Sequence, residues 1–176
     1  ENLRYQLRVA QDALALTTAV AQESTLEGGW SGLPNGRFLD VWMKGHMHHA
    51  RRQKETLCVA LWEWQGKTPG AAEIRRIAQG LRGDDLMVEL APNRLLLLLP
   101  QASQEGAQVL LERVSRELGN PPMGATLWLS DRDDLMLNAA MRRAEQARQE
   151  SLQGSGGITW KHPTQVALEP SPPAIR

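Results

Sequence analysis

The stretch RGDDLMVELAPNRLLLLLPQ, residues 82–101, decides how the rest of the chain is interpreted. A charged turn leads into one apolar run, and the short break APNR, residues 91–94, separates it from a second run that is more apolar still. Two such runs joined by a tight turn predict a β-hairpin with buried strands. A turn in this position often carries a functional site. This one has no carboxylate, glycine or nucleophile, so any functional residues are expected around the turn and not in it.

The bulk composition is that of a globular protein. The 176 residues are enough for one domain with a core and an additional element. A formal net charge of zero argues against a nucleic-acid-binding surface, so we expect no nucleic-acid partner. The single cysteine, Cys58, lies in an apolar run, which predicts a core thiol and excludes a disulfide framework. No run of about 18 apolar residues predicts a membrane span.

Residues 1–23 predict one helix. Apolar and small residues recur at alternating spacings of four and three, as in the a and d positions of a coiled coil: Leu3, Leu7, Ala10, Leu14, Thr17 and Ala21. We expect a connector helix through which two copies of the chain form a homodimer. The alternative is a helix that packs on its own domain. Because the chain opens in the middle of this pattern and without Met, we interpret it as part of a longer protein.

The remaining pattern alternates strands and helices. After a glycine-rich loop, we expect helices at 37–53, 71–81 and 133–152, and a further helix that starts at Ser103 and has an apolar face through Val114. We expect strands at 56–65, 85–90, 94–100, 123–130 and 158–160. The order β-α-β-β-α-β around a central hairpin predicts an α+β fold, with a ferredoxin-like, nucleotidyl-cyclase-like sheet and flanking helices. The domain organisation expected is a connector at 1–23, a globular domain at 24–160 and a proline-rich tail at 161–176.

Four stretches of the chain resemble GGDEF domains, the fold of diguanylate cyclases. They are WSGLPNGRFLD (30–40), LCVALWEWQ (57–65), RGDDLMVELAPNRLLLLLP (82–100) and AAMRRAEQAR (139–148). Each match is weak alone, but their order and spacing agree with the family over roughly residues 24–150. The resemblance places the family's signature turn at residues 91–95. In the family, its glycines admit the substrate phosphates and its acidic residues hold the catalytic metal ions.

The residues at the signature do not suit that chemistry. Pro92 removes a backbone N–H, and Arg94 puts a cation where a divalent metal requires an anion. The family's guanine-reading segment after the first strand is largely missing between Glu63 and residue 73. Glu63 aligns with the first metal-binding aspartate of the family, but one carboxylate cannot organise two-metal phosphoryl transfer. We therefore predict no enzyme activity, no metal and no cofactor.

The resemblance implies that the family's product site is kept in this sequence. In the family, an Arg-x-x-Asp motif five residues before the signature binds cyclic di-GMP, and Arg82 and Asp85 stand in that register. A guanidinium can form paired hydrogen bonds with guanine O6 and N7 or with a phosphate. A carboxylate can accept hydrogen bonds from guanine N1–H and the exocyclic amine. The family often adds an arginine from the next helix, a position held here by Arg113, with Arg116 one turn further as the fallback.

Simpler interpretations stay open for these charges. Arg82, Asp85 and Arg113 could be solvated residues or a surface ion pair of small energetic value. A second Arg-x-x-Asp, residues 37–40, is assigned to a helix surface. His46 and His49 could share a helix face, but without a third ligand we assign them to the surface too. Trp62 and Trp64 alternate along a strand, which predicts core packing on one side.

The leading function expected from the resemblance is a non-catalytic receptor for cyclic di-GMP, with Arg82, Asp85, Arg113 and Arg116 as the ligand-binding residues. The resemblance also implies a bacterial, cytoplasmic location, within a longer membrane-linked protein, and a partner in the membrane or in polysaccharide secretion. The rival is a nucleotide-free structural or dimerisation scaffold. A third alternative is GTP binding through Glu63 without turnover.

Overall fold

The computed structural model describes residue 4 and residues 6–13, 26–154 and 156–163 of the chain. Residues 6–13 are helical and all exposed. The rest of the predicted connector helix lies outside the described residues, and the coiled-coil prediction lies there with it. Residues 164–176 of the predicted tail are outside them as well. Within the described ranges, no helix has the length and hydrophobicity that a membrane span requires.

A five-stranded sheet in the order β2-β3-β1-β4-β5 forms the middle of the domain. The central strand β1 (Thr56–Glu63) pairs antiparallel with β3 (Arg94–Pro100) on one side and with β4 (Met123–Leu129) on the other. The hairpin partner β2 (Leu86–Ala91) forms one edge, and the short β5 (Ile158–Trp160), parallel to β4, forms the other. The predicted hairpin is confirmed, because β2 and β3 pair antiparallel through the turn at Pro92 and Asn93.

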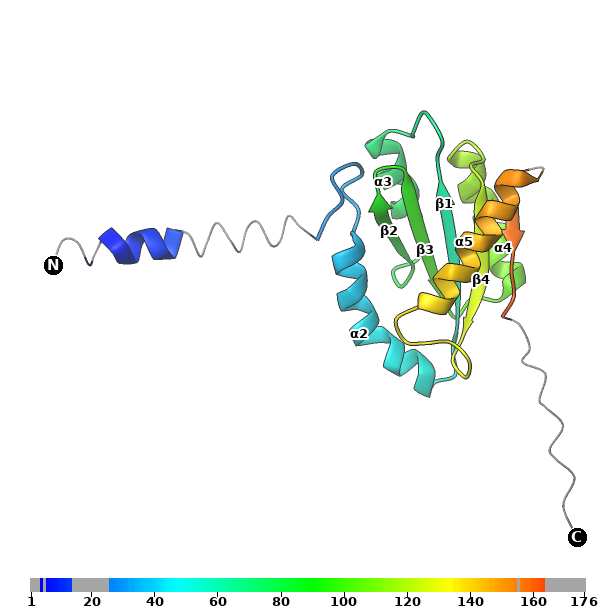
Figure 1. The fold of residues 1–176 in the computed structure, drawn as a ribbon, viewed down its shortest axis with the longest axis horizontal. Coiled ribbons are helices and arrows are strands. Elements are labelled where there is room, and N and C mark those ends of the chain that lie inside the picture. The colour runs from blue at the N-terminus through cyan, green and yellow to red at the C-terminus, as the bar shows by residue number, and fades with distance from the viewer. Residues whose placement is uncertain (1–3, 5, 14–25, 155, 164–176) are drawn as a thin grey trace, which may run out of the picture.

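Helices cover both faces of this sheet (Figure 1). The helices α3 (Ala71–Gln79) and α4 (Gln104–Glu117) share one apolar core with the sheet. The helices α2 (Gly36–Arg52) and α5 (Asn138–Gln153) share a second core with its other face, and Figure 1 shows α5 crossing in front of the strands. The β-α-β-β-α-β order with this strand order confirms the predicted α+β, ferredoxin-like class.

Burial on both faces explains why the central strands are apolar without alternation. Along β1, Cys58 and Trp62 belong to the core under α3 and α4, whereas Leu57 and Leu61 belong to the core under α2 and α5. In an antiparallel sheet with one face exposed to solvent, apolar and polar residues would instead alternate along each strand. Burial also raises the pKa of the Cys58 thiol to about 12. The thiol therefore stays protonated, as expected of a core cysteine.

Local signals set the beginnings of the helices. The Asn35 side chain accepts hydrogen bonds from the N–H groups of Arg37 and Phe38, which starts α2. Ser103 caps α4 by accepting from the Gly106 N–H at 3.1 Å, at the position predicted from the sequence.

The last helix, α5, begins at residue 138 rather than at the predicted residue 133. Asp133 is not helical because its carboxylate turns back to accept from the Leu129 N–H at 2.8 Å. The same carboxylate pairs with both terminal nitrogens of Arg143 at 2.7 Å. Asp134 then accepts hydrogen bonds from two N–H groups in the first turn of α5. These bonds from the Asp133 and Asp134 side chains to nearby backbone N–H groups replace the helical hydrogen bonds that residues 133–137 would otherwise form. The helix therefore begins later than the apolar pattern predicts.

The contact between α5 and β4 requires a glycine at position 124. A Cβ atom at Gly124 would lie 1.9 Å from the Ala144 carbonyl oxygen and 2.2 Å from the Arg148 nitrogen. We expect Gly124→Ala to lower the free energy of unfolding by about 2–3 kcal/mol, because helix and strand must separate. Gly45→Ala is the matched control: its Cβ meets no atom within 4 Å inside α2. That control should gain about 0.5–1 kcal/mol from helix propensity. Urea denaturation of both variants measures the difference, and equal effects would contradict the close packing.

Candidate ligand cavity and the hairpin turn

A cavity of about 430 Å³ lies between the turn that precedes β2, the end of β3 and the first half of α4. Its charged lining residues are Arg82, Asp85 and Arg113. Leu81 and Leu110 add apolar surface to its wall. The structure therefore brings together three of the four residues that the sequence selected for ligand binding. A cavity of this size with a few charged groups and an apolar wall has the form of a small-molecule site.

The turn that carries Arg82 and Asp85 is held by reciprocal hydrogen bonds. The Asp85 carboxylate accepts from the Arg82 N–H at 3.0 Å, and the Asp85 N–H donates to the Arg82 carbonyl at 3.1 Å. These bonds fix the backbone and leave the Arg82 guanidinium exposed. Burial is the main reason why the pKa of Asp85 is raised, with Asp84 adding to it and the Arg82 N–H opposing it. Within the described residues, neither Arg82 nor Arg113 forms an ion pair, so both are available to a ligand.

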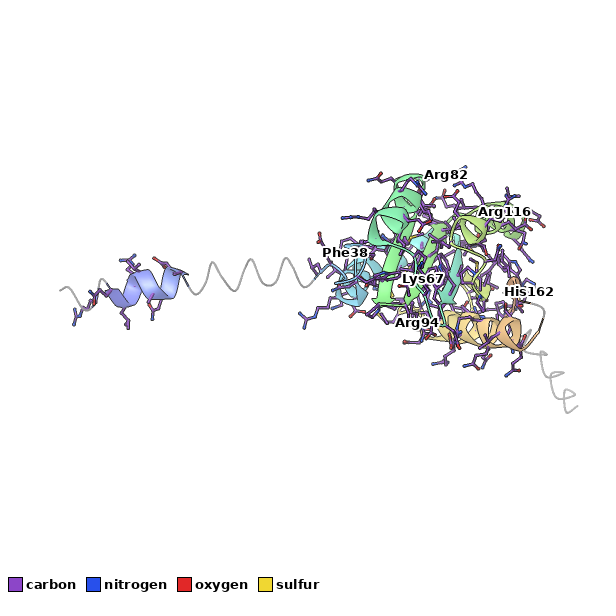
Figure 2. All side chains as sticks on the ribbon, turned by 90° about the horizontal axis from the view of Figure 1, so that it is seen from above. Phe38, Lys67, Arg82, Arg94, Arg116 and His162 are labelled. Carbon is purple, nitrogen blue, oxygen red and sulfur yellow. The ribbon has the colours of Figure 1, made fainter. Side chains whose placement is uncertain are left out.

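Arg116 does not lie in this cavity. It lines a separate cavity of about 320 Å³ between α4 and the segment before β5, and its Nε donates to the Glu112 carbonyl at 3.4 Å. Figure 2 shows Arg82 and Arg116 on the same side of the domain, but they line different cavities. Arg116 lies nearly one turn further along α4 than Arg113, next to the segment that leads into β5. Arg116 therefore has no place beside Arg82 and Asp85.

The hairpin turn, where the resemblance places the GGDEF signature, is tied to the end of β1. The Trp64 N–H donates to the Asn93 carbonyl at 2.9 Å. The Asn93 amide donates to the Glu63 carboxylate and to the Trp64 carbonyl, both at 3.3 Å. The turn residues are thus held by hydrogen bonds within the protein.

Two arginines and two glutamates form a charge network beside this turn. Arg94 donates to Glu145 at 3.0 Å. Arg148 donates to both oxygens of Glu145, at 2.7 and 2.9 Å, and its Nη2 lies 3.4 Å from the Glu63 carboxylate. The Arg148 side chain is only 7% exposed. The hydrogen bond from Arg148, aided by the charge of Arg94, lowers the pKa of Glu145 against the opposing effect of burial. The carboxylate at position 63 therefore faces a guanidinium.

Tryptophans fill the space beside the short connection from β1 to α3. Trp64 is buried, and the ring of Trp30 meets it edge-on with the ring centroids 5.6 Å apart. The Trp30 indole N–H donates to the Pro69 carbonyl at 3.2 Å, so this ring also holds the connection itself. Trp62 lies in the same core, as the alternation along the strand predicts. In the family that the sequence resembles, this connection carries the guanine-reading segment; here it is short and covered by an indole.

The histidines of α2, which the sequence raised as possible metal ligands, contact an aromatic ring and a carboxylate. His46 stacks on Trp42 with ring centroids 4.5 Å apart, and the exposed His49 has its Nε2 3.9 Å from the mostly buried carboxylate of Glu55. In the part of the chain that the structure describes, no group of three or more His, Cys, Asp or Glu residues could hold a metal ion.

Comparisons with solved structures identify the fold. The chain superposes on the diguanylate cyclase SiaD of Pseudomonas aeruginosa, solved with its activator SiaC, with a TM-score of 0.62 and 21% identity over 91% of this chain and 70% of that one. The coiled coil and GGDEF domain of DgcB from Caulobacter crescentus, in complex with c-di-GMP, gives a TM-score of 0.64 and 15% identity over 92% and 100% of the two chains. The GGDEF domain of FimX from Pseudomonas aeruginosa gives 0.63 and 14% over 77% and 99%. The chain has the fold of a GGDEF domain.

Sequence comparison adds nothing to this result. No protein-family model matches the chain, and no curated protein is significantly similar to it. The fold is therefore established by structure, whereas the roles of individual residues rest on their geometry.

Sequence reasoning missed the Glu145–Arg148 pair. The signal was present, because Glu and Arg three residues apart on a helix can share a face. Nothing in the sequence indicated that this face points at Glu63, because the contact between Arg148 and Glu63 joins residues 85 positions apart.

The charge network should stabilise the domain in a pH-dependent way. Because the pKa of Glu145 is lowered by folding, its contribution is fully present above the pKa of an unfolded glutamate and is lost as pH falls through the folded value. We expect Glu145→Gln to cost about 2 kcal/mol at pH 7, and the difference from wild type to shrink below about pH 4. Glu150→Gln, in an exposed ion pair with Lys161, should cost less than about 0.5 kcal/mol. Denaturant unfolding across pH measures both, and a pH-independent Glu145 effect would contradict this assignment.

Proposed function

We propose that this chain is a receptor domain for cyclic di-GMP that does not catalyse its synthesis. The observation that carries the proposal is the cavity at which Arg82, Asp85 and Arg113 meet with both guanidinium groups unpaired within the described residues. Unrelated surface charges would not be expected to converge on one cavity from two elements that the whole β2–β3 hairpin separates in the sequence. The surface-ion-pair interpretation also loses support, because no ion pair between these residues forms in the described chain.

The chemistry of the three side chains suits a guanine nucleotide. Asp85 uses one oxygen to accept from the Arg82 N–H, which leaves the other oxygen for guanine N1–H or the exocyclic amine. Adenine cannot donate from these positions, so the carboxylate would select guanine. Arg82 and Arg113 approach from the turn and from α4, and a guanidinium from each side can bind a base edge or a phosphate. That DgcB was solved with c-di-GMP adds support by analogy of fold.

The absence of catalysis is proposed from the charges at the hairpin turn. Metal-assisted phosphoryl transfer needs anionic ligands that can hold divalent ions against the substrate phosphates. Here the carboxylate of Glu63 lies beside Arg148, and Arg94 occupies the turn itself. A divalent cation would have to displace two guanidinium groups from the carboxylates that they contact. This also weakens the alternative of GTP binding through Glu63.

The setting of the receptor follows from the same proposal. We infer a bacterial cytoplasmic domain that forms homodimers through the helix at residues 1–23. Its output would pass to a partner in the membrane or in polysaccharide secretion, as the resemblance implies. A nucleotide-free scaffold on the same fold is the outcome that a failed titration would support.

Calorimetric titration of the full chain with cyclic di-GMP tests the receptor. We expect wild type to bind, and Arg82→Ala, Asp85→Ala and Arg113→Ala each to weaken binding at least about tenfold, since each removes a charged contact worth about 1.5–3 kcal/mol. Arg116→Ala is the matched control, an arginine of the same helix that lines another cavity, and should bind as wild type does.

Two further controls sharpen this titration. Cyclic di-AMP should bind at least about tenfold more weakly than cyclic di-GMP, because the Asp85 carboxylate would face a base without the matching donors. Equal losses in Arg113→Ala and Arg116→Ala would point to general electrostatic attraction instead of the cavity. If titration of the wild-type chain with cyclic di-GMP gives no binding heat, the receptor proposal fails and the nucleotide-free scaffold is the interpretation that remains.

The lack of synthesis is tested separately. We expect the purified chain, incubated for hours with GTP and either Mg²⁺ or Mn²⁺, to form no cyclic di-GMP detectable by liquid chromatography with mass spectrometry. The reason is that Arg94 and Arg148 occupy the surroundings of Glu63. Formation of cyclic di-GMP that depends on GTP and metal would overturn the proposal that the domain is non-catalytic, even if the cavity also binds the product.

A further inference from the structure

The loop of residues 26–35, called here the connector loop, is fastened to the outer edge of β2. The Glu89 N–H donates to the Pro34 carbonyl at 2.8 Å, and Asn35 forms a parallel bridge with Glu89. Because β2 is an edge strand, its outer side would otherwise present unpaired backbone groups. The connector loop therefore completes this edge, and it joins the globular domain to the residues that precede it in the chain.

The buried side-chain carboxylate of Glu89 in β2 also binds the connector loop. The Glu89 side chain is 4% exposed, and it accepts hydrogen bonds from the Trp30 N–H at 3.1 Å and from the Ser31 hydroxyl at 3.2 Å. Among the ion pairs of the described residues, none includes Glu89. Two uncharged donors recover only part of the cost of burying a carboxylate. Through these two hydrogen bonds, the Glu89 carboxylate ties the position of the loop to that of β2.

The fit between the loop and Glu89 depends on one glycine. A Cβ atom at Gly28 would lie 1.1 Å from Glu89 Oε2, so no other residue fits without moving the loop or the carboxylate. A Cβ atom at the neighbouring Gly29 would meet nothing within 4 Å. The chain thus offers two adjacent glycines, of which one touches the carboxylate and the other does not.

The strand β2 connects this contact with the ligand cavity. Asp85 directly precedes β2, and Glu89 lies within the strand, four residues after Asp85. Four residues of extended strand span about 13 Å. The same six-residue strand therefore has the cavity at its beginning and the connector loop on its outer edge. After Glu89 the pairing with β3 is interrupted by a register shift, so the regular ladder between β2 and β3 ends at the residue that holds the connector loop.

We propose that the connector loop is a clasp that responds to ligand binding: occupation of the cavity at Arg82 and Asp85 tightens the loop on Glu89. The inference rests on the proposed receptor function and adds the route by which occupancy reaches the residues before the domain. A ligand that restrains the turn before β2 also restrains the beginning of that edge strand. The hydrogen bonds between the strand and the connector loop then open less often.

Thermodynamic linkage allows the coupling to be measured in two ways, as the effect of the ligand on the connector loop and as the effect of loop variants on ligand affinity. If the ligand tightens the clasp, damage to the clasp must weaken ligand binding by the same factor. We expect Gly28→Ala to reduce the affinity for cyclic di-GMP about fivefold or more, within the usual range of coupling. Gly29→Ala should stay within about twofold of wild type. Ser31→Ala, which removes one donor to Glu89 without adding an atom, is the second variant in case Gly28→Ala does not fold.

Hydrogen exchange with mass spectrometry on the full chain tests the clasp directly. In wild type and Gly29→Ala, cyclic di-GMP should slow exchange of the amides in residues 28–35 several-fold, because the Gly28, Trp30 and Asn35 N–H groups are hydrogen-bonded in the closed loop. In Gly28→Ala and Ser31→Ala, this slowing should be smaller or absent.

The outcomes separate the two proposals. If wild type binds cyclic di-GMP by calorimetry while exchange in residues 28–35 is unchanged, the clasp is wrong and the receptor stands. Equal affinities of Gly28→Ala and Gly29→Ala would also overturn the clasp. If wild type gives no binding, the receptor fails and the clasp fails with it.

Discussion

The burial of β1 and β3 on both faces is the constraint on which the rest of this structure depends. Helices lie on either side of the sheet, so a charged side chain in the middle of these strands would lose its hydration without a partner. The charged groups are therefore confined to strand ends. At one end, Glu63 stands opposite Arg94. At the other end, Leu57 stands opposite Pro100, next to the cavity.

The hairpin separates these two ends physically. The seven residues of β3 span roughly 20 Å, because an extended strand rises about 3.3 Å per residue. Figure 2 shows Arg82 and Arg94 on different sides of the domain. An apolar, rigidly paired strand lies between them, and the Arg82–Asp85 turn is held by its own reciprocal hydrogen bonds. Residues at the turn can therefore change their chemistry while the geometry of the cavity at the other end is kept.

The parts of this molecule that could be predicted from the sequence are those set by local patterns. The hairpin, the cap at Ser103 and the convergence of Arg82, Asp85 and Arg113 follow from apolar runs, a capping residue and a family register. The predicted start of α5 is wrong because local hydrogen bonds of Asp133 and Asp134 replace the first helical turn, and the helical periodicity does not encode them. The contacts of Glu89 join residues about 60 positions apart, which no local pattern encodes. Arg116 shows the same limit, because only the structure shows that the cavity ends at Arg113 and that the next turn of α4 lines another cavity.

The network at the hairpin turn explains how such a domain can keep its shape without a nucleotide. In a metal-dependent site, neighbouring carboxylates repel one another until cations arrive from solution. Here the cations are covalently part of the chain: Arg94 joins the hairpin to Glu145 of α5, and Arg148 of the same helix joins Glu63 of β1. Three elements are held together by charges that need no ligand. Charge pairs within the chain thus offset at the hairpin turn the repulsion between neighbouring carboxylates that bound cations offset in a metal-dependent site.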